Sequence, residues 1–417
     1  MKSNLSPLTF DSLILLILCT LSEPLPAHAQ SVDWRAARNV AGAYNAFGFN
    51  LLAQMRRSLP DKNIFISPVG AGFALAMVQN GAGGQTGEEI RQALQIDRMG
   101  APEAIAATAS LLQCLQNLNH GDGQGTKTQL EIANSLWINK GFPIKPSFLS
   151  VNQESFKAQV SGADFSAPAT VPLINAWVSE HTHGTIPQIL APPLDPLTQV
   201  IVLDAIYFKS DWLFQFDPKL TSDKPFKLGD GKTPKYPRMY QTGRFQYFEN
   251  RQLQAIALPY SYHVAMYVIL PKSSLSTLVN QLTPDNWKKW TAQMTGRAGS
   301  VELPHMKLEN SYGLDGSLAA LGIRRAFTPE ADFSGISDQS LYVSSVVQKT
   351  FVEVNEQGTM AGAATVLTLT AGIHDPKKEP PPFEMIVDHP FLVAICDNAT
   401  GSVLFLGAIV DPGNSRP

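Results

Sequence analysis

Residues 356–370 read EQGTMAGAATVLTLT, and this stretch is the most informative one for the fold. It begins with the flexible Gly358, continues through very small side chains, and becomes a strand-like alternation of Thr with Val and Leu. Residues 375–382, which are rich in Pro and Lys, follow it like the stalk of an exposed loop. Exposed segments that can pair as strands are normally avoided. The pattern therefore predicts a surface loop that is able to become a strand.

Strand periodicity divides the same segment into two faces, because side chains alternate across a strand. The face that begins with Thr359 continues with Ala361 and Ala363 and ends with Thr365, Leu367 and Leu369, so it can pack on a core. Small residues at its start would allow entry between two existing strands without steric conflict. Composition alone also fits an ordinary central strand followed by a Pro-rich loop, and periodicity does not separate the two interpretations.

Length and charge limit the possible classes of protein. A chain of 417 residues forms one large domain or two ordinary ones, with a sizeable core. The formal net charge of −3 argues against a nucleic-acid-binding surface. No segment after the first thirty residues is long and apolar enough to suggest a membrane span. We expect no cofactor, no nucleic-acid partner and no membrane partner.

The first 29 residues have the pattern of a secretory signal peptide. Lys2 supplies the basic region, residues 13–21 the apolar region, and Ala27-His28-Ala29 the cleavage site before Gln30. We therefore expect one domain over residues 30–417 and a secreted protein, either extracellular or periplasmic. Cys114 and Cys396 remain in that domain, and nothing in the sequence decides whether they pair.

The order of the expected elements favours an α+β fold over a doubly wound one, because helices and strands do not alternate regularly. Helices are expected at residues 32–59, 71–79, 86–94, 101–118, 173–181 and 314–321. Strands are expected at residues 64–66, 130–139, 200–208, 245–258, 263–270, 343–354, 391–396 and 403–410.

The usual catalytic and metal-binding patterns are missing from the sequence. Residues 81–86 (GAGGQT) resemble a phosphate-binding loop only faintly, since they follow a helix and lack the Lys. His181 and His183 lack the helical spacing and the Glu of a zinc hydrolase. His389 is interpreted as a hydrogen-bonded structural residue. No nucleophile elbow occurs, so we predict no catalytic residue, no metal site and no enzyme.

Several long motifs, in the right order and through nearly all of the mature chain, resemble those of the serpin family of protease inhibitors. They are NIFISP (63–68), GAGGQT (81–86), INAWV (174–178) with Thr182, Gly184 and Ile186, DAIYFK (204–209) with Trp212, ADFSGI (331–336), FVEVNE (351–356), DHPF (388–391) and DNATG (397–401). The resemblance is to a secreted, inhibitory-type, bacterial member. It implies the serpin fold, with three β-sheets, eight or nine helices and an exposed reactive-centre loop at about residues 356–382.

The resemblance also implies a mechanism and a monomer. A serine protease, or alternatively a cysteine protease, attacks the bait loop and forms an acyl-enzyme, and the cleaved loop inserts as a strand and traps the protease. The native state would store the free energy for this step. Inhibitory members keep small hinge residues, and this chain fits at Glu356, Gly358, Thr359, Ala361, Gly362, Ala363 and Ala364. The alternative is a non-inhibitory serpin that acts as a carrier or a plain protease substrate.

Two residues depart from the family pattern where the sheet opens, a region that matches Ser67, Asp204, Gln348 and Trp212 in this chain. The family usually has Asn where this chain has Asp204 and His where it has Gln348. We expect the Gln348 amide to donate a hydrogen bond to the Asp204 carboxylate. Our hypothesis is that a buried Asp204 makes sheet opening sensitive to pH.

The scissile bond follows from the family's usual loop length. Counting from Glu356 gives Gly372-Ile373, which suits elastase-like or subtilisin-like proteases. Because the segment up to Pro382 is longer than usual, cleavage at Lys377 or Lys378 by a trypsin-like protease remains the alternative.

Overall fold

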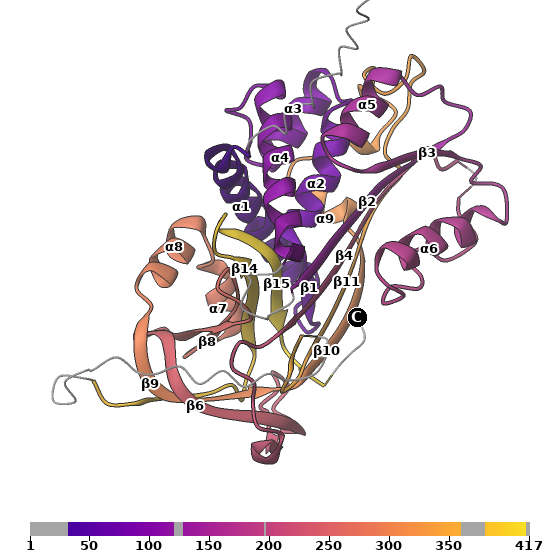
Figure 1. Cartoon of the computed structure of the whole chain (residues 1–417). Helices are drawn as coiled ribbons and strands as arrows, with labels where there is room; N and C mark the ends of the chain where they lie inside the picture. The colour runs from indigo at the N-terminus through magenta and orange to yellow at the C-terminus, as the bar shows by residue number, and fades with distance from the viewer. Residues whose placement is uncertain (1–31, 121–127, 196, 360–379, 414–417) are drawn as a thin grey trace, which may run out of the picture. The chain divides into compact units, whose positions relative to one another are not determined.

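The computed structural model describes residues 32–120, 128–195, 197–359 and 380–413. From Asp33 onward these residues belong to one contact unit, and all elements below belong to it. Two β-sheets organise the unit, and nine α-helices among the described residues pack around them (Figure 1).

The first sheet has six strands in the order β10-β11-β12-β4-β2-β3, with a further pairing between β11 and β4. Its strands are β2 (Gln129–Asn139), β3 (Gln159–Ala163), β4 (Val200–Asp211), β10 (Met306–Gly313), β11 (Ser345–Val354) and β12 (Gly358–Thr359).

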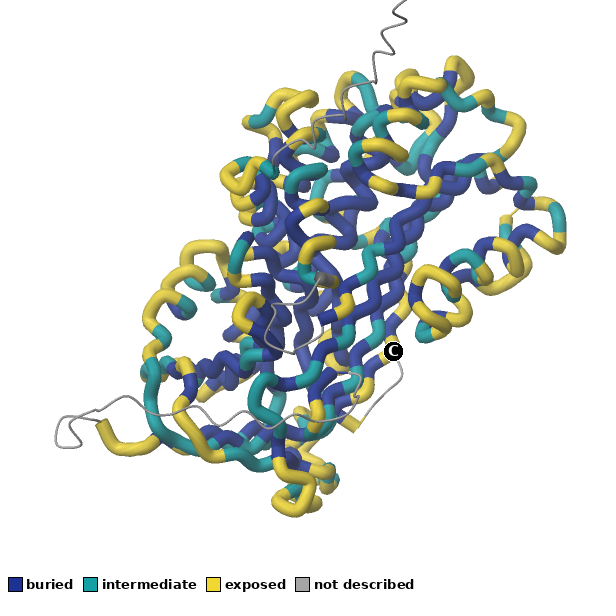
Figure 2. The backbone as a smooth tube through the Cα atoms, in the orientation of Figure 1, coloured by how far each residue is buried: buried dark blue, intermediate teal, exposed yellow. Residues whose placement is uncertain are grey.

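β4 is buried along almost its whole length because helices cover both of its faces. Leu203 and Ala205 pack with Ile174 of α6 (Thr170–His181) on one face. On the other face, Asp204 points toward Gly70 of α2 (Pro68–Gln79). Figure 1 shows α2 and α6 on opposite sides of this sheet, and Figure 2 shows the buried backbone of the strands between them.

The second sheet has nine strands. Its main path is β1-β15-β14-β8-β7-β6-β9-β13, and β5 pairs with β6 beside it. Its strands are β1 (Ile64–Ile66), β5 (Ser222–Pro225), β6 (Lys235–Glu249), β7 (Leu253–Pro259), β8 (Val264–Pro271), β9 (Thr295–Pro304), β13 (Phe383–Ile386), β14 (Phe391–Asp397) and β15 (Ser402–Ile409). The 15-residue β6 pairs with β5, β7 and β9 and so connects these strands into one hydrogen-bonded array.

The remaining helices are α1 (Trp34–Ser58), α3 (Gly84–Ala93), α4 (Ala101–Gln116), α5 (Pro146–Glu154), α7 (Leu275–Asn280), α8 (Pro284–Ala292) and α9 (Asp315–Ala320). At the start of α2, Pro68 lies in the first turn and the Ser67 hydroxyl accepts the Gly70 N–H. Within the described residues, none of the helices combines the length and the hydropathy that crossing a bilayer would need.

The single strand expected over residues 245–258 is wrong, because the structure divides it into the end of β6 and all of β7. The Asn250 side chain accepts the backbone N–H groups of Gln252 and Leu253 and so closes a turn between the two strands. β9 and β10 were not expected at all, although β10 alternates buried and exposed residues along its whole length.

Candidate functional site

The site lies where β4 and β11 part. These two parallel strands pair directly from Ile201 and Ser345 to Ile206 and Thr350, and we call this stretch the seam. Beyond it the short strand β12 lies between them, antiparallel to both. β4 and β11 are therefore paired directly along the seam and separated by a third strand beyond it.

β12 consists of Gly358 and Thr359, two of the predicted hinge residues. Thr359 pairs with Val354 of β11 on one side and with Ser210 of β4 on the other. Its side chain is fully buried. The predicted face that begins with Thr359 is thus, at its first residue, the face that enters the core.

Gly358 is required by the close approach of the backbones. Its φ of +152° disfavours other residues, and a Cβ there would overlap the carbonyl oxygen of Ser210. A glycine at this position lets the hinge turn into the gap beside β4.

An aromatic pair supports residues 355–359, which include the described hinge residues Glu356, Gly358 and Thr359. The Trp212 ring stacks on Tyr260 with centroids 4.3 Å apart and an interplanar angle of 7°. The Trp212 indole N–H donates to the Asn355 carbonyl at 2.8 Å, and the Trp212 backbone N–H donates to the Gln357 carbonyl at 2.8 Å. The Tyr260 hydroxyl lies 2.6 Å from the Thr359 hydroxyl. We call Trp212 and Tyr260 the seat.

Glu356 anchors the base of the hinge on its outer side. Its carboxylate accepts a hydrogen bond from the Thr221 hydroxyl at 2.6 Å and lies 2.8 Å from Nε2 of His305. Burial alone would raise the pKa of Glu356, but the hydrogen bonds and the His305 charge outweigh it, so the pKa lies below its usual range.

The predicted sheet-opening residues Ser67, Asp204 and Gln348 meet in the middle of the seam. The Gln348 amide donates to Asp204 Oδ2 and to the Ser67 carbonyl, and its own carbonyl accepts the Ser67 N–H at 3.0 Å. Asp204 and Gln348 are register partners across the seam. Their contact therefore ties β4, β11 and α2 together at the point that an inserting strand would have to part.

Asp204 is a buried carboxyl group without a charged partner. Burial raises its pKa to about 7, against the opposing effect of the Gln348 hydrogen bond. Within the described residues Oδ1 of Asp204 has no hydrogen-bond partner, and neither has Oδ1 of Asn134, its register partner on β2. A protonated Asp204 carries a hydrogen-bond donor that its carboxylate form lacks.

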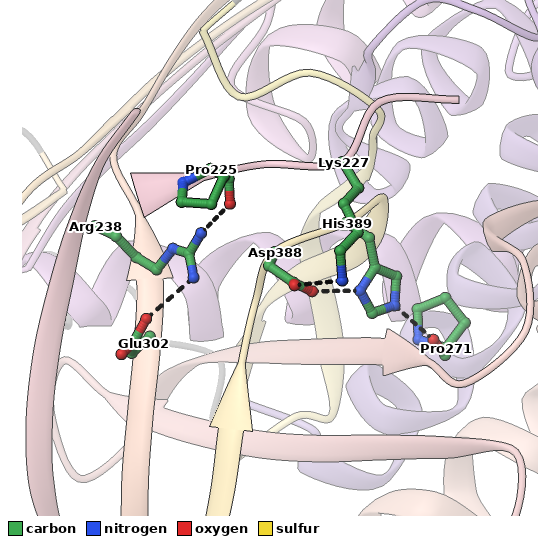
Figure 3. A network of polar contacts seen from close by, with 7 residues as sticks. All are labelled: Pro225, Lys227, Arg238, Pro271, Glu302, Asp388 and His389. Atoms are coloured by element: carbon green, nitrogen blue, oxygen red, sulfur yellow. Dashed lines mark hydrogen bonds and ion pairs between the residues drawn. The ribbon is translucent and has the colours of Figure 1, made fainter. Parts of the chain in front are cut away.

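A second set of contacts holds the chain after the loop (Figure 3). His389 hydrogen-bonds to Asp388 at 2.8 Å and to the Pro271 carbonyl at 2.7 Å, and Asp388 also pairs with Lys227 at 2.9 Å. His389 is therefore hydrogen-bonded on both ring nitrogens, which agrees with the prediction that it is a structural residue. Nearby, Arg238 pairs with Glu302 at 3.0 Å and donates to the Pro225 carbonyl.

β13 is fastened to the same end of the second sheet. Phe383 stacks on Tyr247 with ring centroids 3.7 Å apart. The Arg297 guanidinium donates to the Pro381 carbonyl and lies over the Tyr247 ring. Both ends of the predicted loop are therefore attached to well-packed parts of the molecule.

Several predicted residues lie outside the described part of the chain. They are the hinge residues Ala361, Gly362, Ala363 and Ala364, both residues of the predicted scissile bond, Gly372 and Ile373, the alternative Lys377 and Lys378, and the predicted signal peptide.

Among the described residues no group of three or more His, Cys, Asp or Glu side chains is placed to hold a metal ion. His181 stacks on Trp177 at the end of α6, and His183 lies 3.9 Å from Glu131. Cys114 and Cys396 are both buried free thiols, and burial raises the pKa of Cys114 to about 11.

Sequence reasoning missed Tyr260, His305 and Asn134. Tyr260 is 99 residues from Thr359 along the chain, and His305 is 51 residues from Glu356. No local pattern marks either pair. The only available signal was a lone aromatic residue after a strand, which is usually a core residue.

Comparison with known proteins agrees with this geometry. Residues 42–412 match the family model described as "Serpin (serine protease inhibitor)". An uncharacterised serpin-like protein of Thermococcus kodakarensis is 35% identical over 378 residues, covering 89% of this chain and 86% of the relative. Leukocyte elastase inhibitor of Bos taurus is 34% identical over 389 residues, with 89% and 99% covered.

Solved structures of serpins are also similar to this chain. Human thyroxine-binding globulin matches with a TM-score of 0.80 and 26% identity, over 90% of this chain and 99% of that one. Mouse protein Z-dependent protease inhibitor matches with a TM-score of 0.79 and 27% identity, over 91% and 98%. The two sheets, the nine helices among the described residues and the family match over most of the chain have one explanation: the protein belongs to the serpin family.

Proposed function

We propose that this protein is a suicide-substrate inhibitor of serine proteases. The protease's own serine would attack the carbonyl of the bait residue, break the peptide bond and remain attached as an ester. The freed segment after Thr359 would then enter the seam as a new strand of the six-stranded sheet and carry the protease with it. This chain would supply no catalytic group, only the bait and the free energy of insertion.

The observation that carries the proposal is the position of β12. Thr359 pairs with both β4 and β11, so the first residue of the inserting face has already entered the gap that the rest would follow. Small residues come next in the sequence. The names of two relatives, leukocyte elastase inhibitor and protein Z-dependent protease inhibitor, favour protease inhibition as well.

The energy available from insertion is consistent with a trap. Each new buried backbone hydrogen bond contributes about 0.5–1.5 kcal/mol net, and a strand inserted between two others gains bonds on both sides. Over a dozen residues the gain exceeds the cost of parting the six direct register pairs of the seam. The native fold would therefore be less stable than its loop-inserted form.

We propose Gly372-Ile373 as the scissile bond and an elastase-like or subtilisin-like protease as the target. Cleavage at Lys377 or Lys378 by a trypsin-like protease is the alternative. Mass spectrometry of the peptide released from the trapped complex distinguishes them, because a new N-terminus at Ile373 supports the first and one at Lys378 or Glu379 the second.

We also propose that residues 1–29 are removed during export and that the mature protein is a secreted monomer. N-terminal sequencing of protein recovered outside the producing cell should begin at Gln30. A chain that keeps Met1 and stays inside the cell would contradict this assignment.

The second candidate is a non-inhibitory carrier, because human thyroxine-binding globulin shares this fold with a TM-score of 0.80. A carrier has no need of a seam that opens. The two candidates therefore differ in what cleavage of the loop does to the rest of the molecule.

The test mixes the mature protein with elastase, subtilisin and trypsin and separates the products on a denaturing gel. We expect a covalent band at the summed mass and a marked rise in melting temperature after loop cleavage. Thr359→Arg is the matched control, because a charged side chain does not fit this fully buried position. It should be cleaved at the same bond without forming the band. Clean cleavage of the wild type, with no band and no change in melting temperature, would refute the proposal.

A further inference from the structure

The Tyr260 hydroxyl is a buried polar group at the entrance of the seam. Tyr260 is fully buried, and the partner that the structure gives its phenol is the Thr359 hydroxyl at 2.6 Å. Burial raises the pKa of Tyr260 far above its ordinary range, so the phenol keeps its proton, and either of the two hydroxyls can donate. A buried hydroxyl without a partner is unfavourable. The Tyr260 hydroxyl is therefore destabilising when Thr359 is absent, and the hydrogen bond to Thr359 removes this cost.

The Tyr260 ring is held in place without help from the hinge. It stacks on Trp212 and makes an edge contact with Phe208 of β4, with centroids 5.3 Å apart. Its backbone N–H donates to the Val264 carbonyl at 2.9 Å, which closes the turn between β7 and β8. The neighbouring Pro259 carbonyl accepts the Leu213 N–H at 2.8 Å, which ties this turn to the end of β4. The phenol is thus a fixed reference point beside the gap.

A hydroxyl fixed in position matters because a strand can enter a sheet in more than one register. A slip of one residue moves every side chain to the opposite face. The residues on either side of Thr359 in the sequence are Gly358 and Met360, and neither carries a hydroxyl, the Met thioether being only a weak acceptor. A slip of one residue in either direction would therefore take the Thr359 hydroxyl away from the buried Tyr260 hydroxyl.

We propose that Tyr260 is a positioning residue for loop insertion: its hydroxyl seats Thr359 and so sets the register in which the following residues enter the seam. This inference rests on the proposed inhibitory function and assigns one step of it. Seating must come before insertion, and insertion competes with release of the protease by hydrolysis of the ester. If the contact between Tyr260 and Thr359 is weakened, a larger share of the inhibitor should therefore end as the cleaved, inactive form.

The experiment compares Tyr260→Phe, Thr359→Val and the double variant with the wild type. Tyr260→Phe keeps the ring that stacks on Trp212 and removes only the hydroxyl. The readout is the ratio of cleaved to trapped inhibitor after reaction with subtilisin. We expect a three- to tenfold increase in that ratio for either single variant, which is the size of one buried hydrogen bond. The double variant should be no worse than the single ones, because both remove the same contact.

Three further measurements separate seating from a general loss of structure. Thr359→Ser keeps the hydroxyl and should restore the wild-type ratio. Tyr262→Phe, at a tyrosine with 58% exposure, is the matched control and should change nothing. The rate of the initial attack on the loop should be the same in all variants, since the bait bond is untouched.

Hydrogen exchange of the Thr359 amide tests the seat without any protease. Tyr260→Phe should accelerate this exchange about three- to tenfold, while Tyr262→Phe should not. If the wild type forms no covalent complex, the inhibitory function fails, and an accelerated exchange would still support the seat. Unchanged exchange in Tyr260→Phe, or additive effects of the two single substitutions on the ratio, would overturn the inference.

Discussion

Replacing Asp204 with Asn should remove most of the pH dependence of the closed seam. The groups that face Asp204 are Gln348 from β11, Asn134 from β2, and Ser67 and Gly70 at the start of α2. None of these four residues titrates. The pH response of this cluster therefore belongs to the Asp204 carboxyl alone.

The direction of the change of stability with pH follows from the direction of the pKa shift of Asp204. Burial raises the pKa of Asp204 from 3.8 to about 7. Between these values the folded protein binds more protons than the unfolded chain, so its stability falls as pH rises. The contribution is complete below pH 3.8 and is lost as pH passes through about 7. The closed seam is weakest in mildly alkaline solution.

The magnitude follows from the same shift. A displacement of about three pKa units corresponds to about 4 kcal/mol over the whole range, and about 2 kcal/mol of this falls between pH 5.5 and 8. Asp204→Asn replaces the carboxyl with an amide that can donate to Asn134 and accept from Gln348 at any pH. Its stability should therefore change with pH by about 2 kcal/mol less than that of the wild type.

The assay is urea unfolding at pH 5.5 and 8, followed by tryptophan fluorescence. Asp338→Asn is the control, because it removes the same charge from a carboxylate with 91% side-chain exposure. Inhibition rate constants over the same pH range report whether opening of the seam follows its stability. Parallel pH profiles for the wild type and Asp204→Asn, in both measurements, would refute the role of Asp204.

Four other substitutions test the contacts around the hinge and the seam. Gly358→Ala should expel β12 and increase the fraction of cleaved, untrapped inhibitor at least tenfold on a denaturing gel, because a Cβ would overlap the Ser210 carbonyl. Gly70→Ala should lower the free energy of unfolding by about 1–3 kcal/mol, since its Cβ would lie 2.5 Å from Asp204 Oδ1. Gly42→Ala, in α1 with open space around it, should instead raise that free energy by about 0.5–1 kcal/mol. Glu356→Gln should flatten the loss of stability below about pH 4.5, because the pKa of Glu356 is depressed and its contribution is lost as pH falls. A Gly358→Ala protein that traps protease as well as the wild type would contradict the close approach to Ser210. A change of the same sign in the free energy of unfolding for Gly70→Ala and Gly42→Ala would contradict the contact between Gly70 and Asp204. An unchanged dependence of stability on pH below about 4.5 in Glu356→Gln would contradict the role of Glu356.

Local sequence was sufficient for the features that depend on periodicity and turn chemistry. The strand expected at residues 200–208 lies within the buried β4, and the cap of α2 is formed by Ser67 and Pro68, which are neighbours in the sequence. The contact between Gln348 and Asp204 followed from the family motifs and from the complementary chemistry of an amide and a carboxyl group. Expectations failed where a local turn interrupted an apolar run, as at Asn250.

Tertiary structure alone decided which distant residues meet at the seam. Thr359 is held by Tyr260, Glu356 by His305 and Thr221, and Asp204 lies opposite Asn134 in the register of β4 and β2. These partners are 51 to 135 residues apart in the chain. Such contacts leave no local periodicity, because each arises only when two sheets and a turn have packed together. The sequence therefore predicts a loop that can become a strand, and the packing places the first residue of its expected inward face, Thr359, between β4 and β11.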